Sequence, residues 1–119
     1  MNLKPGDVWL ADLGLAAKTR PVIIVSCNDP YPPRALVICV PVTSQNRGSA
    51  YEIELPRVSF LKRGSVANVQ GIRSEPLARL EVRLGKLPDD SLIKIKAALL
   101  FALDLEANIN SEGEPELSE

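Results

Sequence analysis

Proline and glycine divide this chain into short segments, and this division is the strongest constraint on its fold. Ten prolines lie in 119 residues, and a proline inside an α-helix removes a hydrogen bond and clashes with the preceding turn. The prolines therefore argue against an all-helical fold. The apolar runs 21–26 (PVIIVS) and 35–43 (ALVICVPVT) predict strands, and the first fits a buried strand. Pro41, near the end of the second run, favours an edge strand or a bulge.

Further short segments extend this β pattern. Residues 8–10 follow a Pro-Gly turn, and residues 51–55 (YEIEL) alternate apolar and acidic side chains, as a strand with one wet face does. Strands are also expected from Ser65 to about Gln70 and within 81–87.

The apolar spacing changes to a helical period after residue 88. Leu92, Ile95 and Leu99 recur at helical spacing behind the acids Asp89 and Asp90, and acids are favoured near the positive end of a helix. Other apolar residues lie outside this stripe, so the helix is expected to be well buried or shared with a second chain. Several short strands and one helix predict a mainly β (α+β) fold, a small antiparallel β-barrel with a C-terminal α-helix.

Charge is separated along the chain. Six of the fifteen acids lie within 104–119, which holds no Lys or Arg. The rest of the chain therefore contains nine acids and all fourteen basic residues, an excess of five positive charges. A basic body suggests an anionic partner. We expect one domain over residues 1–105, and a disordered acidic tail over 106–119 that keeps the protein soluble or competes for the body's ligand.

Several kinds of chemistry are excluded by what the sequence lacks. It contains no histidine and only two cysteines, Cys27 and Cys39, so the usual general base is absent and a tetrahedral zinc site cannot be built from cysteine alone. We expect no metal, no cofactor and two reduced, buried cysteines. The first residues have no signal-peptide pattern, and no apolar run is long enough to cross a membrane. These features predict a cytoplasmic protein.

The order of several motifs is more specific than any one of them. PGDVWLADL, TRPVIIVS, VICVPVTSQ, VANVQGIRS and a final apolar helix follow one another between Lys4 and Leu105. In this order the chain resembles the MazF/PemK/Kid-like toxins of bacterial type II toxin–antitoxin modules. The resemblance implies an SH3-like barrel that forms a homodimer. It also implies a sequence-selective, metal-independent endoribonuclease that cleaves single-stranded RNA by 2′-hydroxyl attack and leaves a 2′,3′-cyclic phosphate. An antitoxin protein would block the site, and operator DNA would be bound only through the toxin–antitoxin complex.

The same resemblance gives two residues a catalytic role. Arg20 in TRP matches the family's catalytic arginine, and a fixed guanidinium stabilises negative charge that develops on phosphate oxygens. A solvated arginine at the start of a strand is the alternative. Thr43 in VPVTSQ matches the second site residue, and its hydroxyl can donate to a phosphate oxygen or to the attacking group.

Five further residues form the expected RNA-binding set. Ser44 and Gln45 follow Thr43 into a loop, where their alternative role is turn formation. Lys18 stands beside the TRP motif. Arg73, in the IRS motif, binds RNA phosphate or forms a structural ion pair with an acid such as Glu75. Gln70 stands where relatives carry an acid.

The chain departs from the family pattern in ways that leave its activity open. Gln70 and Gly71 replace an acid–glutamine pair, and an amide cannot act as a general base. The segment 14–18 is shorter and more apolar than the RNA-binding loop of relatives. An active ribonuclease and a barrel that binds RNA or an antitoxin peptide with little cleavage therefore both stand. A general SH3-like interaction module is less compatible with the few aromatic residues, because proline-rich ligands dock on aromatic grooves.

Overall fold

The apolar segments of the sequence form the strands of one sheet in the computed structural model, which describes residues 2–14 and 19–105. The elements in this part of the chain are β1 (Asp7–Asp12), β2 (Thr19–Ile24), β3 (Leu36–Thr43), β4 (Glu52–Glu54), β5 (Val66–Asn68), η1 (Val69–Gly71), β6 (Arg73–Pro76), η2 (Leu77–Arg79), β7 (Leu80–Lys86) and α1 (Asp89–Ala102). The expected Lys18 contact and the expected tail lie outside the described residues.

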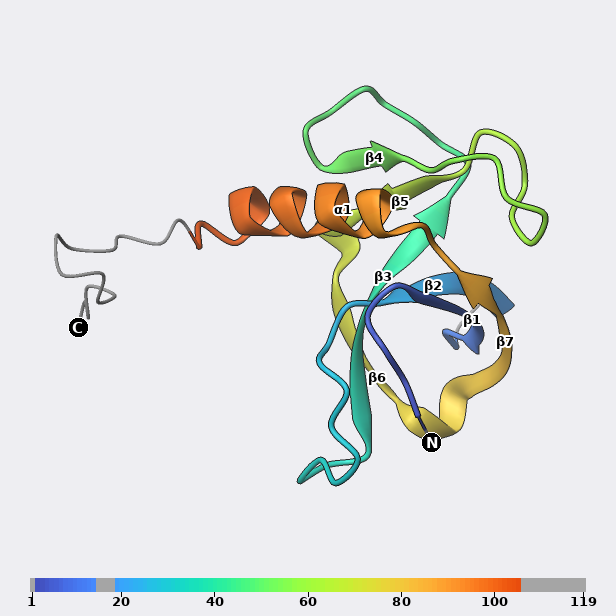
Figure 1. The fold of residues 1–119 in the computed structure, drawn as a ribbon, viewed down its shortest axis with the longest axis vertical. Helices are drawn as coiled ribbons and strands as arrows, with labels where there is room; N and C mark the ends of the chain where they lie inside the picture. The colour runs from blue at the N-terminus through green and yellow to red at the C-terminus, as the bar shows by residue number, and fades with distance from the viewer. Residues whose placement is uncertain (1, 15–18, 106–119) are drawn as a thin grey trace, which may run out of the picture.

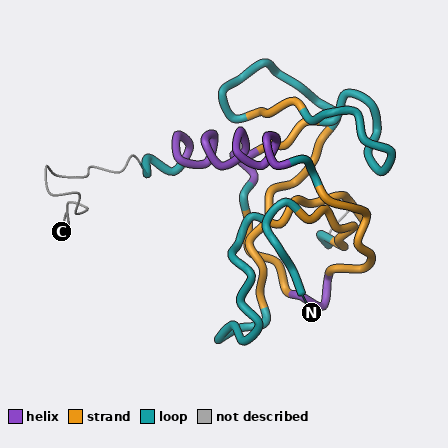
Figure 2. Tube along the Cα trace, in the orientation of Figure 1, coloured by secondary structure: helices purple, strands orange, loops and turns teal. Residues whose placement is uncertain are grey.

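All strand pairs are antiparallel, and the sheet order is β4-β5-β3-β2-β1-β7, with β6 pairing β3 beside this path. The sheet is strongly curved, and α1 lies along one side of it (Figure 1). Strands and connecting loops alternate along the trace ahead of the C-terminal helix (Figure 2). The predicted mainly β fold with a C-terminal helix is confirmed. The described pairings do not join β4 to β7, so the sheet is barrel-like without closing.

Strand β3 is the centre of this arrangement, and Pro41 lies where its neighbours change. Along one edge β3 pairs β2, with Val22 opposite Pro41. Along the other edge it pairs β6 over 36–39 and β5 over 42–43. The edge strand expected around Pro41 is wrong, because β3 is paired on both sides. Proline fits in its interior because the residue falls between the two ladders of that second edge, where no donor is needed.

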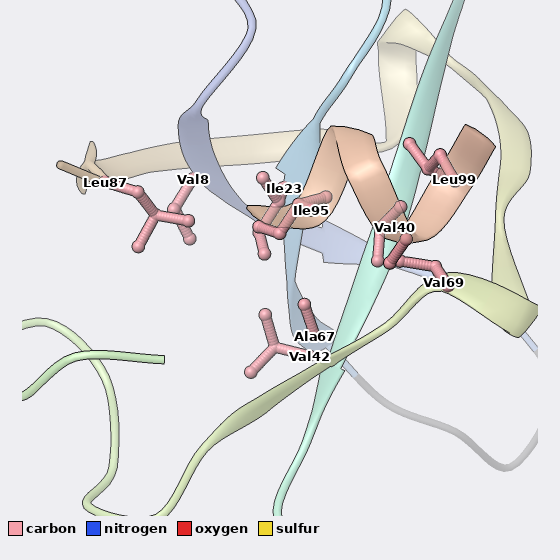
Figure 3. Packing of buried hydrophobic residues seen from close by; sticks show 10 residues of the cluster. Val8, Ile23, Val40, Val42, Ala67, Val69, Leu87, Ile95 and Leu99 are labelled. Carbon is pink, nitrogen blue, oxygen red and sulfur yellow. The ribbon is translucent and has the colours of Figure 1, made fainter. Parts of the chain in front are cut away.

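Alternate residues of the strands build two apolar clusters on the two faces of the sheet. Val8, Ile23 and Val40 belong to the cluster beneath α1, where Ile95 and Leu99 of the helix meet them (Figure 3). Val22, Ile24 and Val37 belong to the other cluster. Strands with both faces buried read as continuous apolar runs, which explains the sequence at 21–24.

The helix is half buried rather than wholly buried. Ile95, Ala98 and Leu99 face the sheet. On its outer side Ile93 is 67% exposed and Leu100 50% exposed. The helix therefore presents a second apolar stripe to its surroundings, as the sequence predicts for a helix shared with another chain.

The described structure differs from the sequence expectations in three further ways. Strand β6 was not expected, because its sequence RSEP is polar and proline-terminated, and only its pairing with β3 reveals it as a strand. Cys39 is buried as expected, but Cys27 is exposed, and both are free thiols. Expected strand limits also shift: residues 69–71 form a 3₁₀ turn, and β2 ends at Ile24, although the backbone N–H groups of Val25 and Ser26 still donate to the Ile38 carbonyl of β3.

Asp7 of the GDVW motif joins two parts of the fold. Its carboxylate is buried and accepts hydrogen bonds from the Lys4 backbone N–H at 3.1 Å and the Arg83 guanidinium at 3.2 Å. The motif therefore ties the segment before β1 to β7. No helix in the described part of the chain is long and apolar enough to cross a membrane.

Gly85 has a steric role that predicts a measurable loss of stability. A carbon added at Gly85 would lie 2.6 Å from Cδ1 of the Phe60 ring, which packs on the core beneath α1. Gly85→Ala should therefore lower the free energy of unfolding by about 1–3 kcal/mol, the usual cost of overpacking. Urea unfolding of the single variant and of Gly85→Ala in a Phe60→Ala background forms a double-mutant cycle. An equal cost in both backgrounds would show that Phe60 is not the cause.

Candidate functional site

The two residues expected to be catalytic lie at one end of neighbouring strands. Strand β2 begins at Thr19 and β3 ends at Thr43, and the two run antiparallel with Val22 opposite Pro41. Arg20 lies two residues before Val22, and Thr43 lies two residues after Pro41. Because the strands are antiparallel, both residues lie at the same end of the sheet. Arg20 is exposed and, within residues 2–14 and 19–105, its guanidinium has no ion-pair partner. Its charge is available to an anion.

A polar cleft of about 430 Å³ opens beside Thr43. Its walls come from the end of β3, the loop 44–51, the start of β4 and the turn after β5. The lining residues are Thr43, Gln45, Arg47, Ser49, Tyr51, Glu52, Asn68 and Gln70. Three of the residues predicted from the sequence are thus brought together in one cavity. Ser44 is exposed on the same loop, and neither it nor Arg20 lines the cleft.

Thr43 is held by a local turn. Its hydroxyl oxygen accepts a hydrogen bond from the Gln45 backbone N–H at 3.2 Å. The hydroxyl hydrogen is left to donate elsewhere, because a hydroxyl carries one donor and two acceptor positions. The turn role expected for this segment and a donor role for Thr43 are therefore compatible.

Gln70 is positioned by the short η1 turn, and its neighbour has a steric reason to be glycine. The Asn68 side chain accepts from the Gln70 backbone N–H at 3.2 Å and caps the turn. A carbon added at Gly71 would lie 2.8 Å from Cγ of Pro41, closer than non-bonded carbons approach. A glutamine at residue 71 is therefore incompatible with this position of the Pro41 ring.

Arg73 is in a different part of the protein and has a partner. It pairs with Cys39 in the sheet, and its Nε lies 2.7 Å from Oε1 of Glu75, whose side chain is only 6% exposed. Of the two roles that the sequence leaves open, the structural ion pair is the one present. Burial raises the pKa of the Cys39 thiol to about 11, and the charge of Glu75 adds to this rise. Cys39 is therefore a protonated thiol near neutral pH.

Glu52 is the one carboxylate among the cleft-lining residues, and it is already engaged. It accepts hydrogen bonds from the backbone N–H of Arg47 and from Ser49, and these bonds lower the pKa of its carboxyl. Among the described residues, no group of three or more potential metal-binding side chains is present. The cleft thus offers hydroxyls, amides and a guanidinium, which suit a polar or anionic ligand.

Sequence reasoning missed several cleft residues. Arg47, Ser49 and Tyr51 belong to the loop whose path cannot be known before β4 is placed. Asn68 and Glu52 are opposite each other on β5 and β4, and the acidic side of YEIEL was interpreted only as a wet face. That alternation was the available signal, because an acid facing a polar loop is a natural acceptor for its N–H groups.

The chain is a small β protein with a curved antiparallel sheet and a C-terminal helix. Arginine, threonine and amide side chains lie at one end of the sheet, where they can bind an anion. Residues 4–103 match the family model of the PemK-like, MazF-like toxins of type II toxin–antitoxin systems. The chain belongs to this family.

Individual relatives agree with this assignment. The chain is 32% identical over 100 residues to a probable endoribonuclease, MazF5, of Mycobacterium tuberculosis, covering 83% of this chain and 91% of that protein. Its fold is similar to a mycobacterial endoribonuclease in complex with its cognate antitoxin, with a TM-score of 0.77 at 27% identity over 89% of this chain and 98% of the other. It is also similar to the M. tuberculosis toxin MazF-mt6, with a TM-score of 0.74 at 27% identity over 84% and 98% of the two chains.

The ion pair on β6 predicts a stability effect at Arg73. Arg73→Ala leaves the Glu75 carboxylate buried without its partner, so the free energy of unfolding should fall by about 1–3 kcal/mol. Thermal and urea unfolding measure this change. In a Glu75→Gln background the same substitution should cost clearly less, because no buried charge is left behind. A cost that is independent of residue 75 would contradict the structural role.

Proposed function

We propose that this chain is the toxin of a type II module and acts as a metal-independent, sequence-selective endoribonuclease on single-stranded RNA. The observation that carries the proposal is the guanidinium of Arg20, which has no ion-pair partner among residues 2–14 and 19–105 and lies at the same sheet end as Thr43 and the polar cleft. The names of the relatives support the reaction class, because MazF5 is described as a probable endoribonuclease.

The proposed reaction is an attack of the 2′-hydroxyl on the adjacent phosphate. The new 2′-oxygen–phosphorus bond forms as the bond to the 5′-oxygen breaks, and a 2′,3′-cyclic phosphate and a 5′-hydroxyl result. Arg20 stabilises the charge that develops on the phosphate oxygens, since charge-assisted donors act most strongly there. Thr43 donates from its hydroxyl. Gln45 and Gln70 contact the RNA from the cleft, and Ser44 contacts it from the neighbouring loop. Lys18, which lies outside the described residues, is proposed as a further RNA contact from its place beside the TRP motif alone.

A second candidate function is a toxin-like barrel that binds RNA or an antitoxin peptide and cleaves poorly. It is favoured by one observation: the cleft holds an amide at residue 70, and its carboxylate, Glu52, is occupied by loop N–H groups. No lining side chain is thus a free acceptor for the 2′-hydroxyl proton. Catalysis by Arg20 and Thr43 alone then relies on charge stabilisation.

Partners follow from the family and from the outer face of α1. A cognate antitoxin is proposed, because a similar structure contains one, and operator DNA is bound only through that complex. A homodimer is proposed because Ile93 and Leu100 form an exposed apolar stripe, and such stripes are usually covered. The cytoplasm, where messenger RNA is available, is the proposed location.

The central test is cleavage of a mixed single-stranded RNA pool with a chelator present. Wild type should cut at preferred sequences and leave 2′,3′-cyclic phosphate ends. Arg20→Ala should slow single-turnover cleavage about 10²- to 10³-fold, the usual value of one such donor. Arg20→Lys should not restore the rate fully, because a point charge lacks the forked geometry. Binding without cleavage by wild type would favour the second candidate, and wild-type rates in Arg20→Ala would remove Arg20 from the mechanism.

Assembly is tested separately by light scattering. At micromolar concentration the measured mass should be about twice the 12.9 kDa of one chain. Leu100→Glu should shift the mass toward that of one chain, because a charge would be buried in the contact. Lys94→Glu is the matched control on an exposed polar position of the same helix. A single-chain mass for wild type would contradict the homodimer.

A further inference from the structure

The two glutamates of β4 hold the loop that joins β3 to β4. This loop, residues 44–51, runs at the top of Figure 1 above the short strand β4, and Gln45, Arg47, Ser49 and Tyr51 from it line the cleft. Glu52 and Glu54 are two residues apart on β4, so their side chains leave the same face of the strand. Both reach the loop.

Glu52 makes the larger set of contacts, and it uses both carboxylate oxygens. Oε2 accepts from the Arg47 backbone N–H at 3.0 Å. Oε1 accepts from the Ser49 backbone N–H at 3.1 Å and from the Ser49 hydroxyl at 2.8 Å. Glu54 makes one contact, in which its Oε1 accepts from the Asn46 side-chain amide at 3.2 Å.

From this geometry we infer that Glu52 is a positioning residue for RNA binding, which holds residues 47–49 in the shape that forms one wall of the cleft. The inference rests on the proposed function for its ligand, but the anchoring of the loop does not. Residues 44–50 are exposed and would otherwise lose conformational entropy each time they are ordered on a ligand. Paying that cost during folding leaves a preformed cleft, which binds more tightly.

Electrostatics makes the opposite prediction. A carboxylate beside a bound phosphate chain repels it, so neutralising Glu52 would strengthen RNA binding if the residue were only a surface charge. If Glu52 positions the loop, neutralising it weakens RNA binding instead. The two roles therefore differ in the sign of one measured affinity change.

The two glutamates form a matched pair for this measurement. Glu52→Gln places an amide NH₂ where one of the two accepting oxygens was, so it faces either the Arg47 N–H or the Ser49 donors and loses that bond. Glu54→Gln keeps a carbonyl oxygen for the single Asn46 donor. Both variants remove one negative charge from the same strand. Glu81→Gln, an exposed residue of β7, a strand that the described pairings do not join to β4, is a further control for net charge.

Two readouts decide the inference in full-length protein. Amide hydrogen exchange without RNA should be faster at residues 47 and 49 in Glu52→Gln, and unchanged there in Glu54→Gln. With a cleavable single-stranded RNA, KM should rise about 10-fold in Glu52→Gln, the size of one lost hydrogen bond to a charged group. The value of kcat should stay within a few-fold, because Arg20 and Thr43 remain in place.

Three results would overturn the inference. Unchanged exchange at residues 47 and 49 in Glu52→Gln would show that the loop does not depend on Glu52. Tighter RNA binding in both β4 variants would show that charge repulsion, not positioning, is its effect. A wild-type protein that neither binds nor cleaves RNA would remove the RNA role together with the proposed function. The exchange result, which needs no RNA, distinguishes that failure from a failure of the anchoring itself.

Discussion

The structure depends on how one strand shares its hydrogen bonds. Strand β3 pairs β2 along one edge and divides its other edge between β6 and β5, with Pro41 at the division. Because β6 pairs only with the first half of β3, β5 can pair with the last residues of β3. This places Asn68, at the end of β5, and Gln70, in the turn after it, beside the end of β3. The cleft exists at Thr43 because that is where β3 and β5 still pair. A proline in the middle of a central strand is tolerated only because no partner there needs its missing N–H.

The parts of the fold visible in the sequence are those with a strong local pattern. The continuous apolar run at 21–24 becomes β2, in which residues 22–24 are buried, and the run at 36–42 becomes β3, although Leu36 and Ile38 are exposed. The change of period after residue 88 becomes α1. Strand β6 could not be foreseen, since RSEP has no strand pattern and its pairing with β3 is a long-range contact. Pro41 was misjudged for the same reason, because which edges of a strand are occupied is a property of the whole sheet.

The candidate site was predictable to the extent that it follows the motifs. Thr43, Gln45 and Gln70 share one cleft, and the position of Arg20 at the same sheet end follows from β2 pairing β3. The sequence alone could not show whether Arg73 belongs to the site or to a structural ion pair. Its ion pair with Glu75 is seen only once β6 is placed. Glu52 lies five residues beyond its farthest backbone partner, so its part in shaping the cleft needs the fold of the loop between them.

The chemistry available to this site is dominated by groups that keep one charge state. The chain contains no histidine, the side chain that most often changes charge near neutrality, so no imidazole alters the charge of the anion-facing side of the site. The hydroxyl and amide groups of Thr43, Gln45 and Gln70 do not ionise there either. The electrostatic field that meets a phosphate is therefore set by the fold rather than by protonation.

The anchoring of the cleft loop separates its shape from its surface chemistry. Two of the three donors that Glu52 accepts are backbone N–H groups, at Arg47 and Ser49, and every residue except proline supplies the same group. Side chains at these positions can therefore be exchanged while the path of the loop is kept. The ligand preference of this protein can therefore change through substitution of loop side chains, while the backbone conformation of the loop stays the same.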